Sequence, residues 1–144
     1  MAYTTIDDPS KYFQTALYTG NGGTLSITND GNSNLQPDWI WTKERSGTSG
    51  NQNHTITDSS RGNTKQLFVN LPSADATSSA FVTSFDSDGF SLGDNANINN
   101  NSSTYVAWQW KCNGGTTETA VDESGSNPAN VRQTNTDAGF SIIT

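Results

Sequence analysis

The stretch Tyr-Val-Ala-Trp-Gln-Trp-Lys at residues 105–111 is the most strand-like segment of the chain, and it decides the fold class. Aromatic and β-branched residues predominate in it, and these residue types favour strands. A similar stretch, Trp-Ile-Trp-Thr-Lys, occupies residues 39–43. Because side chains alternate along a strand, the two tryptophans of each stretch share one face. We predict that the two stretches are paired central strands and that most of the four indoles are buried between sheets.

Shorter runs of the same character recur along the chain, separated by clusters of Gly, Asn, Asp and Ser. They occupy residues 12–19, 25–28, 55–57, 65–69, 80–85, 89–92 and 139–144. Short strands with turn residues between them are typical of an antiparallel sandwich. We expect the runs at 12–19 and 25–28 to form one hairpin and the runs at 80–85 and 89–92 to form another. The sequence therefore predicts an all-β sandwich of two antiparallel sheets.

The composition limits the classes of partner. Ser, Thr and Asn together make up 55 of the 144 residues, and 7 Lys and Arg face 14 Asp and Glu, which leaves a net charge of −7. An acidic surface repels phosphate backbones and anionic lipid, so we expect neither nucleic acid nor membrane as a partner. No segment approaches the roughly 20 apolar residues of a membrane helix. The single cysteine, Cys112, excludes an intramolecular disulfide.

Five motifs, in order along the whole chain, resemble a domain found in structural proteins of marine tailed phages, including cyanophages. They are Tyr-Phe-Gln-Thr-Ala-Leu-Tyr-Thr-Gly-Asn-Gly at 12–22, Leu-Gln-Pro-Asp-Trp-Ile-Trp at 35–41, Ser-Phe-Asp-Ser-Asp-Gly-Phe at 84–90, the stretch at 105–111, and Ala-Gly-Phe-Ser-Ile-Ile-Thr at 138–144. That domain is similar to the concanavalin-like, laminin-G-type sandwich. The resemblance implies a jelly-roll fold and a place on the virion, and it supplies no catalytic residues.

The resemblance leads us to expect a non-enzymatic structural module of a tail fibre, tail or capsid surface that serves assembly and adhesion to the host. Its expected partners are other virion proteins, further copies of the chain with a trimer favoured, and glycans of the host surface. Two alternatives stay open, a capsid decoration protein and a stand-alone carbohydrate-binding module. They differ from the first expectation in context and ligand, and not in residues that the sequence displays.

Candidate site residues follow from side-chain chemistry, and no catalytic set is among them. Exposed indoles stack on sugar rings, and nearby polar side chains can add hydrogen bonds. The candidates for ligand binding are Trp39, Trp41, Asn97, Tyr105 and Trp108. We expect no cofactor, and calcium is the one alternative. Carboxylates are hard oxygen ligands for this ion, whereas Asp in turns more often satisfies local backbone amides. The candidates for this metal site are Asp86, Asp88 and Asp94.

The domain boundaries follow from where the strand pattern begins. Residues 1–10 lack such a pattern, and we expect them to be an arm that docks onto a neighbouring protein. The sandwich is expected to span residues 11–144. Two polar stretches, 94–103 and 114–137, are expected to be a loop and a linker or extended excursion. Because the sequence stops within the expected strand at 139–144, we expect a further domain to follow it.

Overall fold

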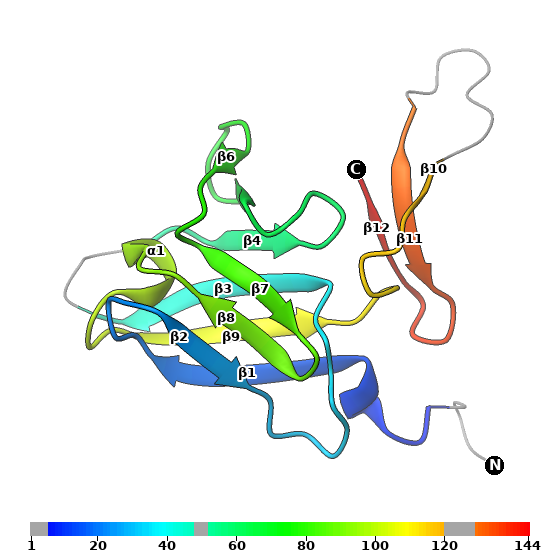
Figure 1. Cartoon of the computed structure of the whole chain (residues 1–144), viewed down its shortest axis with the longest axis horizontal. Coiled ribbons are helices and arrows are strands. Elements are labelled where there is room, and N and C mark those ends of the chain that lie inside the picture. Colours follow the sequence, from blue (N-terminus) through cyan, green and yellow to red (C-terminus); the bar gives the residue numbers. More distant parts are fainter. Residues whose placement is uncertain (1–5, 48–51, 120–128) are drawn as a thin grey trace.

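A computed structural model describes residues 6–47, 52–119 and 129–144 of the chain (Figure 1). The fold is all-β, with three antiparallel sheets, which confirms the predicted class. The expected arm falls partly outside the described residues, since nothing is described before residue 6. None of the helices in the described ranges has the length and apolarity to span a membrane.

The larger layer of the sandwich is a six-stranded sheet in the order β1-β9-β3-β4-β5-β6. Its strands are β1 (Phe13–Thr19), β9 (Thr104–Trp110), β3 (Trp39–Ser46), β4 (Thr55–Asp58), β5 (Lys65–Phe68) and β6 (Ala76–Thr77). The two tryptophan-rich strands are paired near the centre, with Trp39 opposite Trp110 and Trp41 opposite Trp108. The predicted central pair is therefore confirmed.

The second layer is a three-stranded sheet in the order β2-β8-β7, which crosses one face of the larger sheet in Figure 1. Its strands are β2 (Leu25–Thr28), β8 (Gly89–Leu92) and β7 (Val82–Asp86). Side chains of this sheet, such as Phe90 and Leu92, form one buried cluster with Ile40 and Ala107 of the larger sheet. Burying such apolar side chains supplies the main stabilisation of the sandwich.

One predicted hairpin is confirmed and the other is wrong. Strands β7 and β8 pair directly across the turn at 86–89. By contrast, β1 pairs with β9 and β2 pairs with β8, so the first two strands lie in different layers. The connection after β1 is fixed by distant residues, because Gly20 N–H donates to Ser103 O and Gly22 N–H to Asn99 O. These contacts direct the chain from one layer to the other.

The polar stretch after β9 forms a third sheet that the sequence did not predict. It consists of β10 (Glu118–Thr119), β11 (Val131–Asn135) and β12 (Phe140–Ile143), and it projects from one end of the sandwich in Figure 1. The expected linker at 114–137 is thus partly strand. The expected loop at 94–103 contains a short helix, α1 (Ala96–Asn99).

A buried polar cluster joins the third sheet to the sandwich. The carboxylate of Asp38 is fully buried and accepts bonds from Cys112 N–H at 2.6 Å, Gly114 N–H at 3.0 Å and Ser59 Oγ at 2.6 Å. The Nε2 of buried Gln133, on β11, donates to the same Ser59 hydroxyl at 2.8 Å. Bonds to a charged acceptor are stronger than neutral ones, so this cluster fixes the position of the third sheet.

The end of the expected arm is already attached to the sandwich. Pro9–Lys11 form a 3-10 helix, η1, capped by Asp8. The Asp8 carboxylate accepts bonds from the Ser10 and Ser33 hydroxyls, and these hydrogen bonds lower the pKa of Asp8. The chain therefore joins the fold at Asp8, two residues before the expected boundary at Ser10. Residues 1–5 of the arm lie outside the described residues.

We expect Asp38→Asn to lower the free energy of unfolding by about 2–4 kcal/mol, because an amide NH₂ cannot accept the bonds that the lost carboxylate oxygen accepts. Burial raises the pKa of the Cys112 thiol, so this thiol should react slowly with an aromatic disulfide reagent in the native protein and faster in the variant. Urea unfolding and thiol labelling measure the two effects. Asp137→Asn, at an exposed carboxylate, is the control and should change stability by less than about 0.5 kcal/mol. Equal stabilities of the two variants would contradict the role of Asp38.

Gly89→Ala should destabilise the sandwich far more than Gly62→Ala. Both glycines have positive φ, at 120° and 92°, so a side chain costs about 1–2 kcal/mol at either position. A Cβ at Gly89 would also lie 1.9 Å from Ile27 O of the paired strand, whereas a Cβ at Gly62 meets nothing within 4 Å. Thermal unfolding of both variants tests this difference, and similar melting temperatures would show that the close approach of β2 and β8 is not limiting.

Candidate binding face

All four tryptophans lie on the outer face of the six-stranded sheet, and the prediction that most are buried between the sheets is wrong. Along β3, buried Ile40 and Thr42 alternate with half-buried Trp39 and Trp41. Because Ile40 belongs to the core cluster, the alternating indoles point away from it. Both faces of this strand carry apolar side chains, so periodicity alone did not distinguish them.

The third sheet covers one end of this outer face. The ring of Phe140 on β12 stacks on Trp110 with centroids 6.1 Å apart and meets Trp39 edge-on at 6.4 Å. Phe13 of β1 packs on the same indole of Trp110 at 4.8 Å. Aromatic pairs in these geometries stabilise the packing beyond the area they bury. Trp39 and Trp110 therefore hold the third sheet in place.

The neighbouring indoles, Trp41 and Trp108, form the second half of the outer face. Their ring centroids are 5.4 Å apart and their planes are tilted by 58°. The indole N–H of Trp41 donates to His54 Nδ1 at 3.1 Å, which fixes the orientation of the Trp41 ring. Both indoles are half-buried, so part of each ring is in contact with solvent.

Apolar side chains continue this surface on both sides. Ile56 of β4 lies opposite Trp41, and Val106 of β9 lies opposite Leu17 of β1. Leu17 is 64% exposed and Val69, just after β5, is 51% exposed. We call the partly exposed Trp41 and Trp108, together with the exposed Leu17 and Val69, the aromatic face, whereas Ile56 and Val106 are buried at 5% and 8% exposure. Exposed apolar side chains that gather on one face of a small domain are typical of an interaction site.

Two predicted ligand residues, Tyr105 and Asn97, do not lie on the outer face that carries the tryptophans. Tyr105 is fully buried on the opposite side of β9, stacked on Tyr18 at 5.2 Å, and its hydroxyl donates to Ala96 O. Burial raises the pKa of Tyr105, as expected for a phenol in the core. Asn97 lies in α1 and bonds to Asn95. Of the five predicted residues, the structure brings together the three tryptophans alone.

The three predicted calcium ligands are not brought together. The carboxylate of Asp86 accepts bonds from the Ser84 and Ser91 hydroxyls, and that of Asp88 accepts one from Leu35 N–H. Asp94 is exposed. Within the described ranges, no group of three or more His, Cys, Asp or Glu side chains is placed to hold a metal ion. Two of the three aspartates, Asp86 and Asp88, therefore accept hydrogen bonds from groups within the fold.

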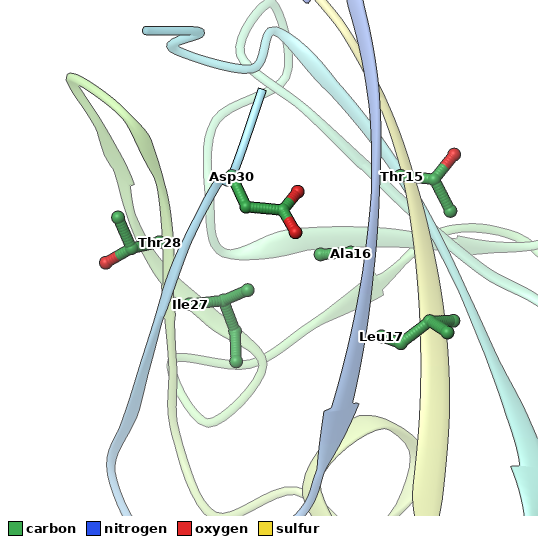
Figure 2. A pocket seen from close by; sticks show the side chains of 6 residues that line it. All are labelled: Thr15, Ala16, Leu17, Ile27, Thr28 and Asp30. Carbon is green, nitrogen blue, oxygen red and sulfur yellow. The ribbon is translucent and has the colours of Figure 1, made fainter. Parts of the chain in front are cut away.

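A small cleft lies at the open edge of the sandwich, between β1 and β2 (Figure 2). It is a cleft of about 280 Å³ into which the side chains of Ala16, Ile27 and Asp30 point, while Thr15 and Leu17 lie on the other side of β1. The cleft is small compared with typical ligand pockets of about 300–1,000 Å³. It shows that the backbone of β1 is open on this side.

Sequence reasoning missed two contributors to the outer face. Phe140 was placed in a strand, but its contact with the tryptophans depends on a third sheet that has no apolar period in the sequence. His54, which the sequence did not assign to this face, accepts a hydrogen bond from the Trp41 indole. The position of His54 could have been predicted from the sequence, because pairing the strand at 39–43 with the strand at 55–57 places residue 54 near Trp41.

Comparison with known proteins gives a family and nothing beyond it. No curated protein and no solved structure matches the chain significantly. A family model described as a domain of unknown function, DUF7483, matches residues 8–144. The match starts at Asp8, the residue whose carboxylate attaches the chain to Ser33, so it spans the sandwich together with the third sheet. The chain therefore belongs to the DUF7483 family.

Proposed function

We propose that this chain is a non-enzymatic structural module of a phage virion, on a tail fibre, tail or capsid surface, and that its aromatic face attaches it to a target. The virion assignment and the laminin-G-type jelly roll rest on the sequence resemblance. The attachment role rests on one observation, the partly exposed Trp41 and Trp108 beside the exposed Leu17 and Val69. Tryptophan is enriched among the residues that contribute most to binding.

Host polysaccharide is the target that the chemistry of this face favours. The C–H faces of a sugar ring pack on indoles, and one of the two indoles here, that of Trp41, is held in place by its hydrogen bond to His54. Thr15, exposed on the strand next to Trp108, offers a hydroxyl for hydrogen bonds. A rigid aromatic surface with polar neighbours loses little conformational entropy on binding.

The buried state of the reactive groups supports a role without catalysis. Cys112 is buried with a raised pKa, and its Sγ donates to Phe140 O at 3.6 Å. Glu44 is also buried, and the exposed Glu118 lies 3.8 Å from Arg132. A carboxylate pair for glycoside hydrolysis needs two groups flanking one sugar bond. The described glutamates do not form such a pair, because Glu44 lies on β3 and accepts a bond from Gln52 N–H, whereas Glu118 lies on the third sheet.

We expect the purified protein to bind bacterial polysaccharides on a glycan array, and Trp108→Ala to weaken that binding at least about tenfold. Trp108→Phe retains a ring and should keep most of the affinity, while Tyr12→Ala, an aromatic truncation before β1, should leave it unchanged. Circular dichroism confirms that the variants are folded. If the wild-type protein binds no glycan on the array, or if Trp108→Ala binds as tightly as the wild type, the proposal that this face attaches to glycans is overturned.

The virion assignment has a separate test. A cryo-EM map of the intact particle should show density for this sandwich on the particle surface. Density at capsomer centres would favour the alternative of a capsid decoration protein, and density on the tail would favour a fibre or tail module. Glycan binding by a protein that is absent from the particle would support the stand-alone carbohydrate-binding module instead.

A further inference from the structure

Strand β1 forms an open edge of the six-stranded sheet. It pairs with β9 on one side, and among the described residues the sheet order places no strand on the other. The opposite edge of the sheet is β6, which has two residues, whereas β1 has seven. The two edges therefore differ greatly in the length of backbone that they offer.

The backbone groups that face this edge can be identified from the pairing. Lys111 N–H donates to Tyr12 O and Gly20 N–H donates to Ser103 O, so the even-numbered residues of β1 direct their N–H and C=O groups toward β9. The odd-numbered residues direct theirs to the open side. These residues are Phe13, Thr15, Leu17 and Thr19, and among the described parts of the chain their backbone groups have no hydrogen-bond partner.

The usual devices that prevent edge-to-edge pairing are missing from β1. Natural edge strands carry lysine, proline, an inward-pointing charge or a bulge. The sequence of β1 is Phe-Gln-Thr-Ala-Leu-Tyr-Thr, which has neither charge nor proline, and its pairing with β9 has no register shift. Two of its outer side chains, Phe13 and Leu17, are 39% and 64% exposed. The strand has the properties of a pairing surface.

We propose that β1 pairs antiparallel with β1 of a second copy of this chain, so that the two six-stranded sheets form one continuous sheet. The geometry of the strand favours itself as partner. A two-fold axis at Ala16 places Phe13 opposite Thr19 and Thr15 opposite Leu17 of the other copy. In this register the odd-numbered residues form the hydrogen-bonded pairs, as an antiparallel ladder requires.

Charge also favours a second copy at this strand. Each copy carries a net charge of −7, yet β1 itself has no charged residue, so no like charges within the two paired strands face each other. Small Ala16 lies at the axis, where the two backbones approach most closely. The pairing also places Leu17 of each copy beside the other copy's Thr15, so the two aromatic faces become continuous on one side of the sheet.

The interface is isologous, and it therefore closes at two copies. This symmetry differs from the trimer expected from the sequence. The inference does not depend on the glycan proposal, because its test uses the protein without ligand. A protein that fails on the glycan array can still form the dimer, and the reverse also holds.

Sedimentation velocity over a range of micromolar concentrations should show a monomer–dimer equilibrium. Thr15→Pro removes an N–H that faces the open edge and leaves the pairing with β9 intact, and it should raise the dissociation constant at least about tenfold. A protein that stays monomeric at about 100 µM, a concentration that would populate even a weak dimer, would overturn the proposal. A dimer that persists unchanged in folded Thr15→Pro would also overturn it.

A second pair of variants keeps the test independent of proline. Leu17→Lys places a charge on the outer side of β1 and should dissociate the dimer. Ile143→Lys makes the same kind of change on β12, where the side chain is 62% exposed, and it serves as the matched control. The proposal requires that Leu17→Lys alone lowers the sedimentation coefficient. Equal effects of the two variants would instead assign the dissociation to charge in general and overturn the proposal.

Disulfide cross-linking tests the register of the proposed β1–β1 pairing. Ala16→Cys places two thiols at the axis, within the Cα separation that a disulfide spans, so diamide should give a covalent dimer on a non-reducing gel. Thr15→Cys places its thiol opposite Leu17 and should give little cross-link, as should the wild type, whose Cys112 is buried. A stronger cross-link for Thr15→Cys than for Ala16→Cys would overturn the proposed register.

Discussion

The buried carboxylate of Asp38 is the contact on which the arrangement of the outer face depends. It binds backbone N–H groups on both sides of Asn113 and the Ser59 hydroxyl, and through Ser59 it is joined to Gln133 of the third sheet. A buried charge is stable when its hydrogen bonds are complete, and removal of its partners is costly. Asp38 therefore sets where the chain leaves β9, and with it where Phe140 meets the tryptophans.

The position of the third sheet divides four chemically similar indoles into two roles. Trp39 and Trp110 pack under Phe140 and serve stability, while Trp41 and Trp108 lie beyond its reach and retain exposed ring surface. The same division explains why the aromatic face reaches the open edge at β1, since Leu17 is adjacent to Val106 in the register. Binding to a target and pairing of copies are thus proposed for adjoining parts of one sheet.

Local patterns in the sequence located most of the strands but only some of their partners. The β7–β8 hairpin and the central tryptophan pair are as predicted, whereas β6, β10 and β11 carry no apolar pattern that reveals them. The pairing of β1 with β9 joins residues about 90 positions apart, and no turn signal encodes it. Whether the indoles face the core or the solvent depends on which face of the six-stranded sheet the second sheet covers. Phe90 and Leu92 of the second sheet pack on Ile40 and Ala107, so the indoles lie on the uncovered face.

The reliance on polar side chains also shapes the thermodynamics of the fold. Buried Gln109, Gln66 and Asn99 occupy interior positions that aliphatic residues take in many sandwiches, and Asn99 alone donates to the carbonyls of Gly23 and Gly93. Exposure of apolar surface raises the heat capacity on unfolding, whereas exposure of polar surface lowers it. We therefore expect a smaller heat-capacity change on unfolding than a purely apolar core of this size would give. The stability curve would be correspondingly flat, and the free energy of unfolding would vary little between cold and warm surroundings.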